Sequence, residues 1–124
     1  MSFYLMKNTL IVTSKQLFGG SLRIVDRATV FNIICPYLEE AGESSFIYFK
    51  NVRFVWGPSL KSVGNSTFQY CYSLFQVHAP MIQKIGDKAF SGCFSLGRIT
   101  LASLKEIGTD CFNSCDSLQI LQAP

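Results

Sequence analysis

The sequence has little net charge and no cluster of basic residues. Its 11 Lys and Arg residues, set against 8 Asp and Glu residues, are spread along the chain and leave a net charge of +3. A basic patch is the usual mark of a nucleic-acid-binding protein, so we expect no nucleic-acid partner. The sequence also lacks a run of about 18 apolar residues, the length that a membrane-spanning helix needs. We therefore expect no membrane span.

A convincing secretory signal is also missing. The N-terminal apolar segment is interrupted by Lys7, Asn8 and Thr9, and no clear small-residue cleavage site follows it. The sequence leaves the compartment open: the chain is either cytoplasmic or exposed at a surface by an unconventional route.

Residues for catalysis or metal binding are few. The chain has one histidine and five cysteines, of which only Cys111 and Cys115 stand close together. Zinc needs four nitrogen or sulfur ligands, typically in close pairs, and neither a nucleophile elbow nor a phosphate-binding glycine motif is present. We therefore expect no enzyme, no metal and no cofactor.

What the sequence does contain is a period of 22 residues. Phenylalanine, glycine and proline recur at this spacing: Phe46, Phe68, Phe90, Phe112; Gly20, Gly42, Gly64, Gly86, Gly108; Pro36, Pro58, Pro80, Pro124. A fixed repeat of this length is typical of a solenoid, in which each unit is too small to bury its apolar face alone and gains a core by stacking on its neighbours. The period therefore predicts stacked coils with a phenylalanine ladder in the core.

One repeat can be divided into a strand, a second short strand and a helical turn. The apolar run 73–80 predicts a strand that ends at proline, and the apolar pair at 82–85 predicts the second strand. The segment 88–93 is long enough for one or two turns of helix, with Phe90 and Cys93 on its inner face. The repeat thus predicts an α/β solenoid dominated by parallel strands.

The corner before each helical turn carries glycine and then a small polar residue. Glycine at this corner predicts either a positive φ or a close backbone approach. The residue that follows, such as Asn65 or Asp87, is of a type that favours a helix N-cap. Asn65 also begins the glycosylation sequon Asn65-Ser66-Thr67, and the sequence does not decide whether it carries sugar.

The motif Ile85-Gly86-x-x-Ala89-Phe90-x-x-Cys93-x-Ser95-Leu96-x-x-Ile99 resembles the BspA-like class of leucine-rich repeats. The resemblance is specific over residues 36–124 and divides the chain into a cap or degraded repeat at 1–20 and about four and a half repeats at 21–124. Towards the N-terminus Ile24 takes the phenylalanine position, and Arg27 departs from the pattern. The resemblance implies a leucine-rich-repeat solenoid and a protein-binding or adhesion role, with a partner that can be a host or cell-surface protein.

The cysteine column Cys71, Cys93 and Cys115 predicts buried free thiols. Equivalent residues of stacked strands have parallel Cβ atoms about 4.8 Å apart, whereas a disulfide needs converging Cβ atoms about 3.8 Å apart. Cys35, near a strand end, is expected to be the most accessible thiol. A nucleophile and base pair of Cys71 and His78 is disfavoured, because the repeat places one in the core and the other on the outer face.

The outward side of the predicted strands carries an unusual density of aromatic and basic residues, a composition typical of binding hot spots. Either a partner binds there, or an adjoining segment or second copy covers it. The outward columns are Phe31, Asn32, Ile34, Arg53, Phe54, Trp56, Phe75, Gln76, His78, Arg98, Thr100, Gln119 and Gln122. The residues predicted to carry binding are Arg53, Phe54, Trp56, Phe75, His78 and Arg98.

A structural role is the alternative hypothesis. The repeats run to Pro124 with no polar capping unit, which predicts an uncapped apolar end. This end favours either a fragment of a longer array within a surface protein or self-association.

Overall fold

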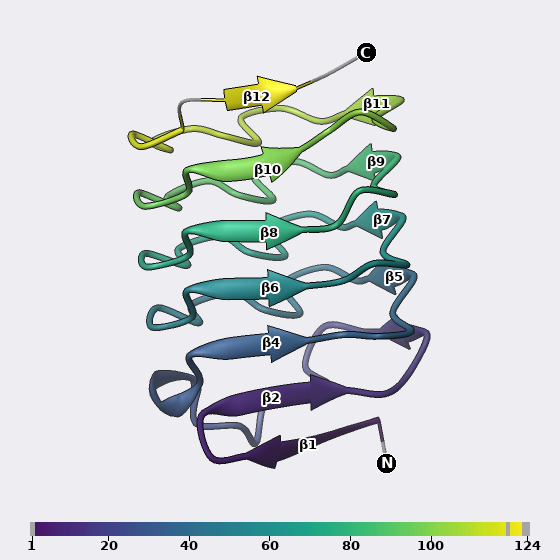
Figure 1. Cartoon of the computed structure of the whole chain (residues 1–124), viewed down its shortest axis with the longest axis vertical. Coiled ribbons are helices and arrows are strands. Elements are labelled where there is room, and N and C mark those ends of the chain that lie inside the picture. Colours follow the sequence, from purple (N-terminus) through teal and green to yellow (C-terminus); the bar gives the residue numbers. More distant parts are fainter. Residues whose placement is uncertain (1, 119, 123–124) are drawn as a thin grey trace.

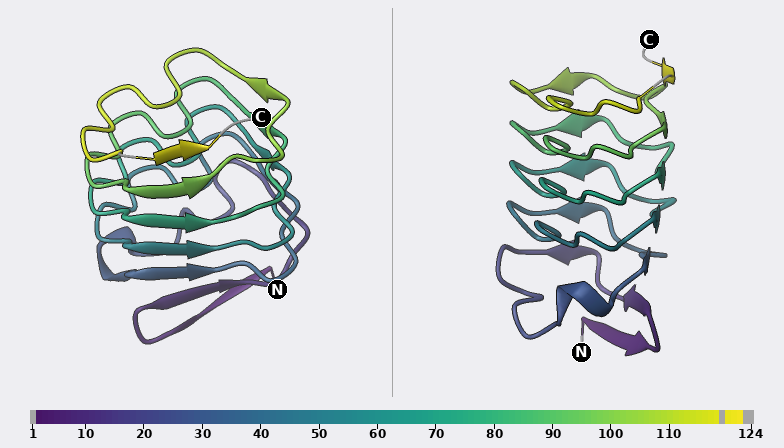
Figure 2. Two further views of the ribbon diagram at one scale, coloured as in Figure 1. Left: turned by 45° about the horizontal axis from the view of Figure 1, so that its top comes forward. Right: turned by 90° about the vertical axis from the view of Figure 1, so that its left-hand side faces the viewer.

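The computed structural model describes residues 2–118 and 120–122, and these form a solenoid of stacked coils (Figure 1). Each regular coil contains one strand of a larger sheet, sheet A, and one two-residue strand of a smaller sheet, sheet B. Strands β1 and β12 lie at opposite ends of the stack, and the views in Figure 2 show the coils lying one above another. The predicted strand-dominated solenoid is confirmed.

Sheet A contains seven strands among the described residues, and all its neighbours pair in parallel except β1 with β2. Its strands, in spatial order, are β1 (Phe3–Met6), β2 (Thr9–Val12), β4 (Asn32–Ile34), β6 (Phe54–Trp56), β8 (Gln76–His78), β10 (Arg98–Thr100) and β12 (Ile120–Gln122).

Sheet B follows the same stacking order and is parallel throughout its described strands. These strands are β3 (Gln16–Leu17), β5 (Glu40–Ala41), β7 (Ser62–Val63), β9 (Lys84–Ile85) and β11 (Glu106–Ile107). In the regular coils the register equals the sequence period, because Val55 pairs with Val77 and Val63 pairs with Ile85. Equivalent residues therefore stack in columns, as the period predicts.

The phenylalanine ladder forms the centre of the core. The ring centroids of Phe46, Phe68, Phe90 and Phe112 are separated by 5.1, 5.2 and 5.5 Å, with interplanar angles of 14°, 7° and 2°. The first three rings are buried. Parallel rings at this separation make van der Waals contact along the stack. The phenylalanine of each coil therefore packs against those of the neighbouring coils.

The predicted helical turns are wrong. Within the described residues the only helix is the short 3₁₀ helix η1 (Arg27–Thr29), which precedes the regular coils. The segments at 44–48, 66–70, 88–92 and 110–114 form a third set of contacts between coils, which we call the turn ladder. Alternate backbone N–H groups donate across it to the following coil, as from Ser44 to Asn65 O, Phe46 to Thr67 O and Tyr48 to Gln69 O, at 3.0, 2.9 and 3.0 Å.

The turn ladder requires left-handed backbone at two positions in every regular coil. Ser66 and Tyr70 have φ values of 57° and 64°, and the same positions have positive φ in the other coils. An L-residue in this region costs roughly 1–2 kcal/mol. The left-handed residues interrupt helical geometry, and every second N–H of the segment bonds to the neighbouring coil, whereas a helix would keep these groups for its own turns. Bonding between coils thus replaces helical bonding.

The predicted N-cap role of Asn65 is also wrong, because no helix follows it. Its Oδ1 atom instead accepts a hydrogen bond of 2.8 Å from the backbone N–H of Asp87, and Asp87 Oδ1 does the same for Thr109. The glycine before each of these residues permits a close approach and has no positive φ. A Cβ at Gly86 would lie 2.6 Å from the backbone nitrogen of Asn65.

The N-terminal part departs from the regular coils. β1 pairs antiparallel with β2 and forms the end of sheet A. The predicted boundary at residues 20–21 falls inside the coil that holds β2, β3 and η1. The expectation that Ile24 takes the phenylalanine position is wrong, because its side chain is 82% exposed while Leu22 and Val25 are buried.

All five cysteines are free thiols, and Cys71 and Cys93 are buried as predicted, whereas the prediction is wrong for Cys115, which is only partly buried; Cys111 is also buried. The expectation for Cys35 is wrong: it is buried, and burial raises the pKa of its thiol to about 12. Cys115 is the least buried of the five. The Sγ atoms of Cys71 and Cys93 lie 3.3 and 3.1 Å from the carbonyl oxygens of Phe46 and Phe68, so the column also links neighbouring coils.

Candidate interaction face

The six residues predicted to bind a partner lie together on the outward side of sheet A, which we call the strand face. Phe54 and Trp56 belong to β6, His78 to β8 and Arg98 to β10. Arg53 directly precedes β6, and Phe75 directly precedes β8. The register aligns them in rows, with Phe54 opposite Gln76, Trp56 opposite His78, and Gln76 opposite Arg98.

The alternation of strand residues explains the placement of the four members that lie within strands, Phe54, Trp56, His78 and Arg98. Successive side chains of a strand point to opposite sides of the sheet. The central residues of β4, β6, β8 and β10 are Ile33, Val55, Val77 and Ile99, and all are buried. Their neighbours on both sides are therefore directed outward. Of the outward columns, Gln119 and the side chain of Gln122 lie outside the described part of the chain.

One row of the strand face combines aromatic and cationic groups. The Arg53 guanidinium lies 5.5 Å from the centroid of the Phe31 ring, within the range of a cation–π contact. Phe75, which follows Arg53 by one repeat in this row, is 51% exposed. Its ring lies against Gly97, where a Cβ would come within 3.1 Å of the ring. The row thus holds two aromatic side chains and one arginine at fixed positions.

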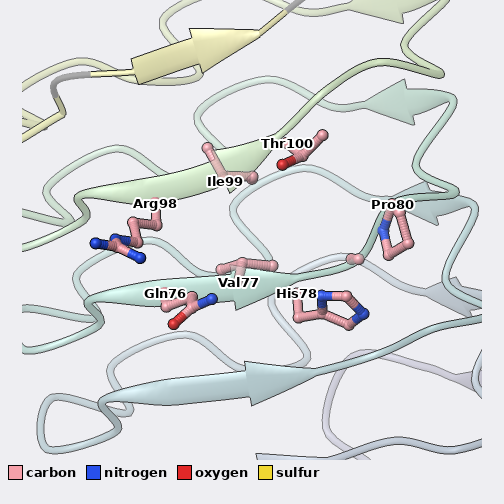
Figure 3. A pocket seen from close by; sticks show the side chains of 8 residues that line it. Gln76, Val77, His78, Pro80, Arg98, Ile99 and Thr100 are labelled. Atoms are coloured by element: carbon pink, nitrogen blue, oxygen red, sulfur yellow. The ribbon is translucent and has the colours of Figure 1, made fainter.

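A hollow of about 440 Å³ opens on the strand face between β8 and β10 (Figure 3). Gln76 and Arg98 lie toward one end of it, with His78 and Thr100 toward the other. Its floor is the backbone of Val77 and Ile99, whose side chains are buried, so it is an open depression in the sheet. Among the side chains around it, Arg98 supplies only hydrogen-bond donors, and Gln76, His78 and Thr100 supply both donors and acceptors.

The strand face carries positive charge without acidic residues. No Asp or Glu occurs at 31–34, 53–56, 75–78 or 97–100, which hold Arg53 and Arg98. The ion pairs among the described residues lie beside sheet B instead, where Lys61–Glu39 and Lys84–Glu106 each have an N–O separation of 3.8 Å. Charges of both signs therefore occur near sheet B, whereas the strand face carries only positive charge.

The residues that could form a catalytic or metal site are kept apart. Cys71 is buried and directed at the Phe46 carbonyl, whereas His78 is exposed on the strand face. In the described residues no group of three or more His, Cys, Asp or Glu side chains is arranged to hold a metal ion.

A second aromatic group lies in the turn ladder and in the residues directly after it, and it was not predicted. Tyr48 and Tyr70 have centroids 4.8 Å apart, and Tyr72 and Phe94 have centroids 5.3 Å apart with nearly parallel rings. Tyr70 and Tyr72, 6.2 Å apart, join the two pairs. The 22-residue spacing within each pair was a usable signal, but the expected helix left the outward positions of this segment undefined.

A family model matches most of the chain. The family model described as "BspA type Leucine rich repeat region (6 copies)" matches residues 30–124. This range contains the regular coils and excludes β1, β2, β3 and η1. No curated protein sequence matches the chain.

Solved leucine-rich repeat structures share the fold. The T. pallidum leucine-rich repeat protein TpLRR matches with a TM-score of 0.74 and 20% identity, covering 96% of this chain and 66% of its own. A leucine-rich repeat protein from Eubacterium ventriosum matches with a TM-score of 0.68 and 13% identity, covering 94% of this chain and 40% of its own. This chain is therefore shorter than either structure. The described residues contain no helix that is long and apolar enough to cross a membrane.

Proposed function

Because the chain belongs to the BspA-type leucine-rich repeat family, we propose that it is a non-enzymatic module that binds a protein partner through the strand face. Leucine-rich repeats are generally protein-interaction modules. The observation that carries the proposal is the grouping of Arg53, Phe54, Trp56 and Phe75 on one face of a regular sheet. Aromatic and arginine side chains dominate the binding energy of protein interfaces.

The mechanism is rigid presentation. Strands β4, β6, β8 and β10 are hydrogen-bonded to their neighbours, and the central residue of each is anchored in the core. The outward side chains are thus held in rows before a partner arrives, so less conformational entropy is lost on binding. Arg53 is further restrained by its contact with the Phe31 ring.

The experiment is affinity capture with the strand face intact or altered. We expect the Trp56→Ala/Phe75→Ala variant to lose the captured protein while its thermal melt stays close to that of the unaltered chain, because both side chains lie on the outer face. The matched control is Tyr72→Ala/Phe94→Ala, which removes two exposed aromatic rings that lie beside the turn ladder. Equal capture by both variants would contradict the proposal.

The adhesion role implied by the family resemblance is the finer form of this proposal. It places the partner on a host or cell surface. The test is binding of the fluorescently labelled chain to intact cells, with Trp56→Ala/Phe75→Ala as the comparison.

Self-association through the same face is the second candidate, because exposed aromatic residues also suit a contact between copies. Phe75 is 51% exposed, so its ring is available for such a contact. Sedimentation equilibrium decides between the candidates. A dimer that Phe75→Ala returns to monomer favours self-association, and a monomer at all concentrations favours a separate partner.

A further inference from the structure

The geometry points to an extended acidic peptide segment as the ligand of the strand face, with its carboxylate at Arg98 and an apolar side chain against Phe54 and Trp56. This inference rests on the proposed function and specifies the chemistry of the partner. Three observations carry it: the segregation of charge, the donor set of the hollow, and the spacing of the rows.

Charge selects an acidic partner. All eight Asp and Glu residues of the chain lie outside the outward positions of sheet A, which carry Arg53 and Arg98. Among the described ion pairs, both lysines are matched by glutamates beside sheet B, and neither arginine of the strand face has such a match. A partner carboxylate would supply the missing charge, and electrostatic complementarity of this kind sets specificity and association rate.

The hollow supplies the donors that a carboxylate needs. Arg98 can donate two parallel N–H bonds to one carboxylate, and the Gln76 amide lies beside it on the neighbouring strand (Figure 3). His78 and Thr100 add further donors along the same opening. A lysine side chain would bring a charge of the same sign as Arg98, so the hollow disfavours basic segments.

The spacing of the rows defines the segment. Phe54, Gln76 and Arg98 form one row that runs along the stack, with Trp56 beside Phe54 on β6. Two steps between neighbouring strands amount to about 9.6 Å, which an extended chain covers in about three residues. The ligand is therefore a segment with a large apolar residue three positions from an Asp or Glu.

The test is selection from a random eight-residue peptide library against the whole chain, followed by titration of the selected synthetic peptides. Trp56 is the only tryptophan, so its fluorescence reports binding at the strand face directly. We expect the selected peptides to carry Asp or Glu three positions from a large apolar residue. Arg98→Ala should weaken them about tenfold or more.

The charge-reversal variant provides the sharper result. Arg98→Glu should select Lys or Arg at the position where the unaltered chain selects Asp or Glu, with the apolar residue retained. Lys84→Ala is the matched control, because it removes an exposed positive charge beside sheet B, and it should leave the selection unchanged. Circular dichroism and thermal melts of each variant separate lost binding from lost folding.

The outcomes separate this inference from the function on which it rests. Peptides that bind through Trp56 without acidic preference would overturn the acidic ligand and leave a protein-binding strand face. Tighter binding of heparin than of any selected peptide would also overturn it, because the ligand would then be an acidic polysaccharide. Selection of peptides that leave Trp56 fluorescence unchanged would overturn both the ligand and the proposed face.

Discussion

The first coil, residues 9–30, and the regular coils, residues 31–118, use the same two sheets and differ at the third contact. Both have one strand in sheet A and one in sheet B. The regular coils are also joined through the turn ladder. In the described structure no backbone N–H of the first coil donates to the carbonyls of Glu43, Ser45 or Ile47, the positions that would continue the ladder.

A side chain replaces part of the missing ladder. Arg27 Nε donates to Ile47 O at 2.9 Å, and its guanidinium lies 5.5 Å from the centroid of the Phe49 ring. Asn51 Nδ2 donates in the other direction, to Ala28 O at 2.7 Å. Coils that share the repeat pattern of the turn bond to each other through backbone groups. The first coil lacks this pattern, and polar side chains join it to the next coil instead.

The largest expected difference between the two regions concerns the phenylalanine position. Phe90→Ala should cost about 3–5 kcal/mol of unfolding free energy, because it leaves a cavity between two stacked rings. Ile24→Ala, at the residue of the first coil that only the 22-residue spacing aligns with the phenylalanines, should change stability by less than about 0.5 kcal/mol, because that side chain is 82% exposed. Urea denaturation of both variants provides the measurement, and equal losses would show that the first coil is packed like the others.

The glycines of the two regions should respond to different substitutions. Gly86→Ala should cost about 1–3 kcal/mol, because its Cβ would approach the backbone of Asn65 to 2.6 Å. Gly20 has a φ of 85° and open space around it. Asn tolerates left-handed backbone, so Gly20→Asn should be milder than Gly20→Ala, whereas Gly86→Asn should be at least as harmful as Gly86→Ala. Thermal melts of the four variants test this reversal.

Alkaline pH should weaken the regular coils through their buried thiols, since the first coil has no cysteine. Burial raises the pKa of Cys35 from 9.0 to about 12. The unfolded chain loses this proton above pH 9 while the folded chain retains it. The ionisation of Cys35 therefore leaves the free energy of unfolding unchanged below pH 9. Between pH 9 and pH 12 it lowers that free energy by about 1.4 kcal/mol per pH unit.

The control for this titration is Cys35→Ala, which keeps the other ionisable groups. Urea denaturation at pH 8, 9 and 10 should show a shallower loss of unfolding free energy in Cys35→Ala than in the unaltered chain. Parallel losses would mean that the Cys35 thiol ionises equally in the folded and unfolded states.

The columns of the core could be predicted from the sequence, and the turn could not. A 22-residue period fixes which residues superpose, so the ladder through Phe68 and Phe90 follows from it. The conformation of 88–92 depends on where each backbone N–H finds an acceptor, and the acceptors belong to the next coil. Local propensity therefore predicted a helical turn and an N-cap at Asn65, and contacts between coils overrode both.

The strand face was predictable for a similar reason, because alternation around buried residues such as Val55 and Val77 defines its outward positions. The hollow between Gln76 and Arg98 was not predictable, because its shape depends on side-chain directions on two neighbouring strands. The burial of Cys35 was missed because proximity to a strand end was taken as exposure, whereas the core of the solenoid continues past the ends of its strands.

The smallest expected effect concerns Arg27, which joins the two regions. Arg27→Ala should cost about 1 kcal/mol, because it removes one hydrogen bond and one cation–π contact at a half-buried site. Arg27→Lys should recover little of this loss, because lysine has no Nε–H donor to reach Ile47 O from the same position. Hydrogen exchange should show faster exchange in η1 and at Tyr48, with little change at Phe90. Faster exchange throughout the chain would mean that the first coil and the regular coils unfold as one unit, and the difference in their contacts would then have no consequence for local stability.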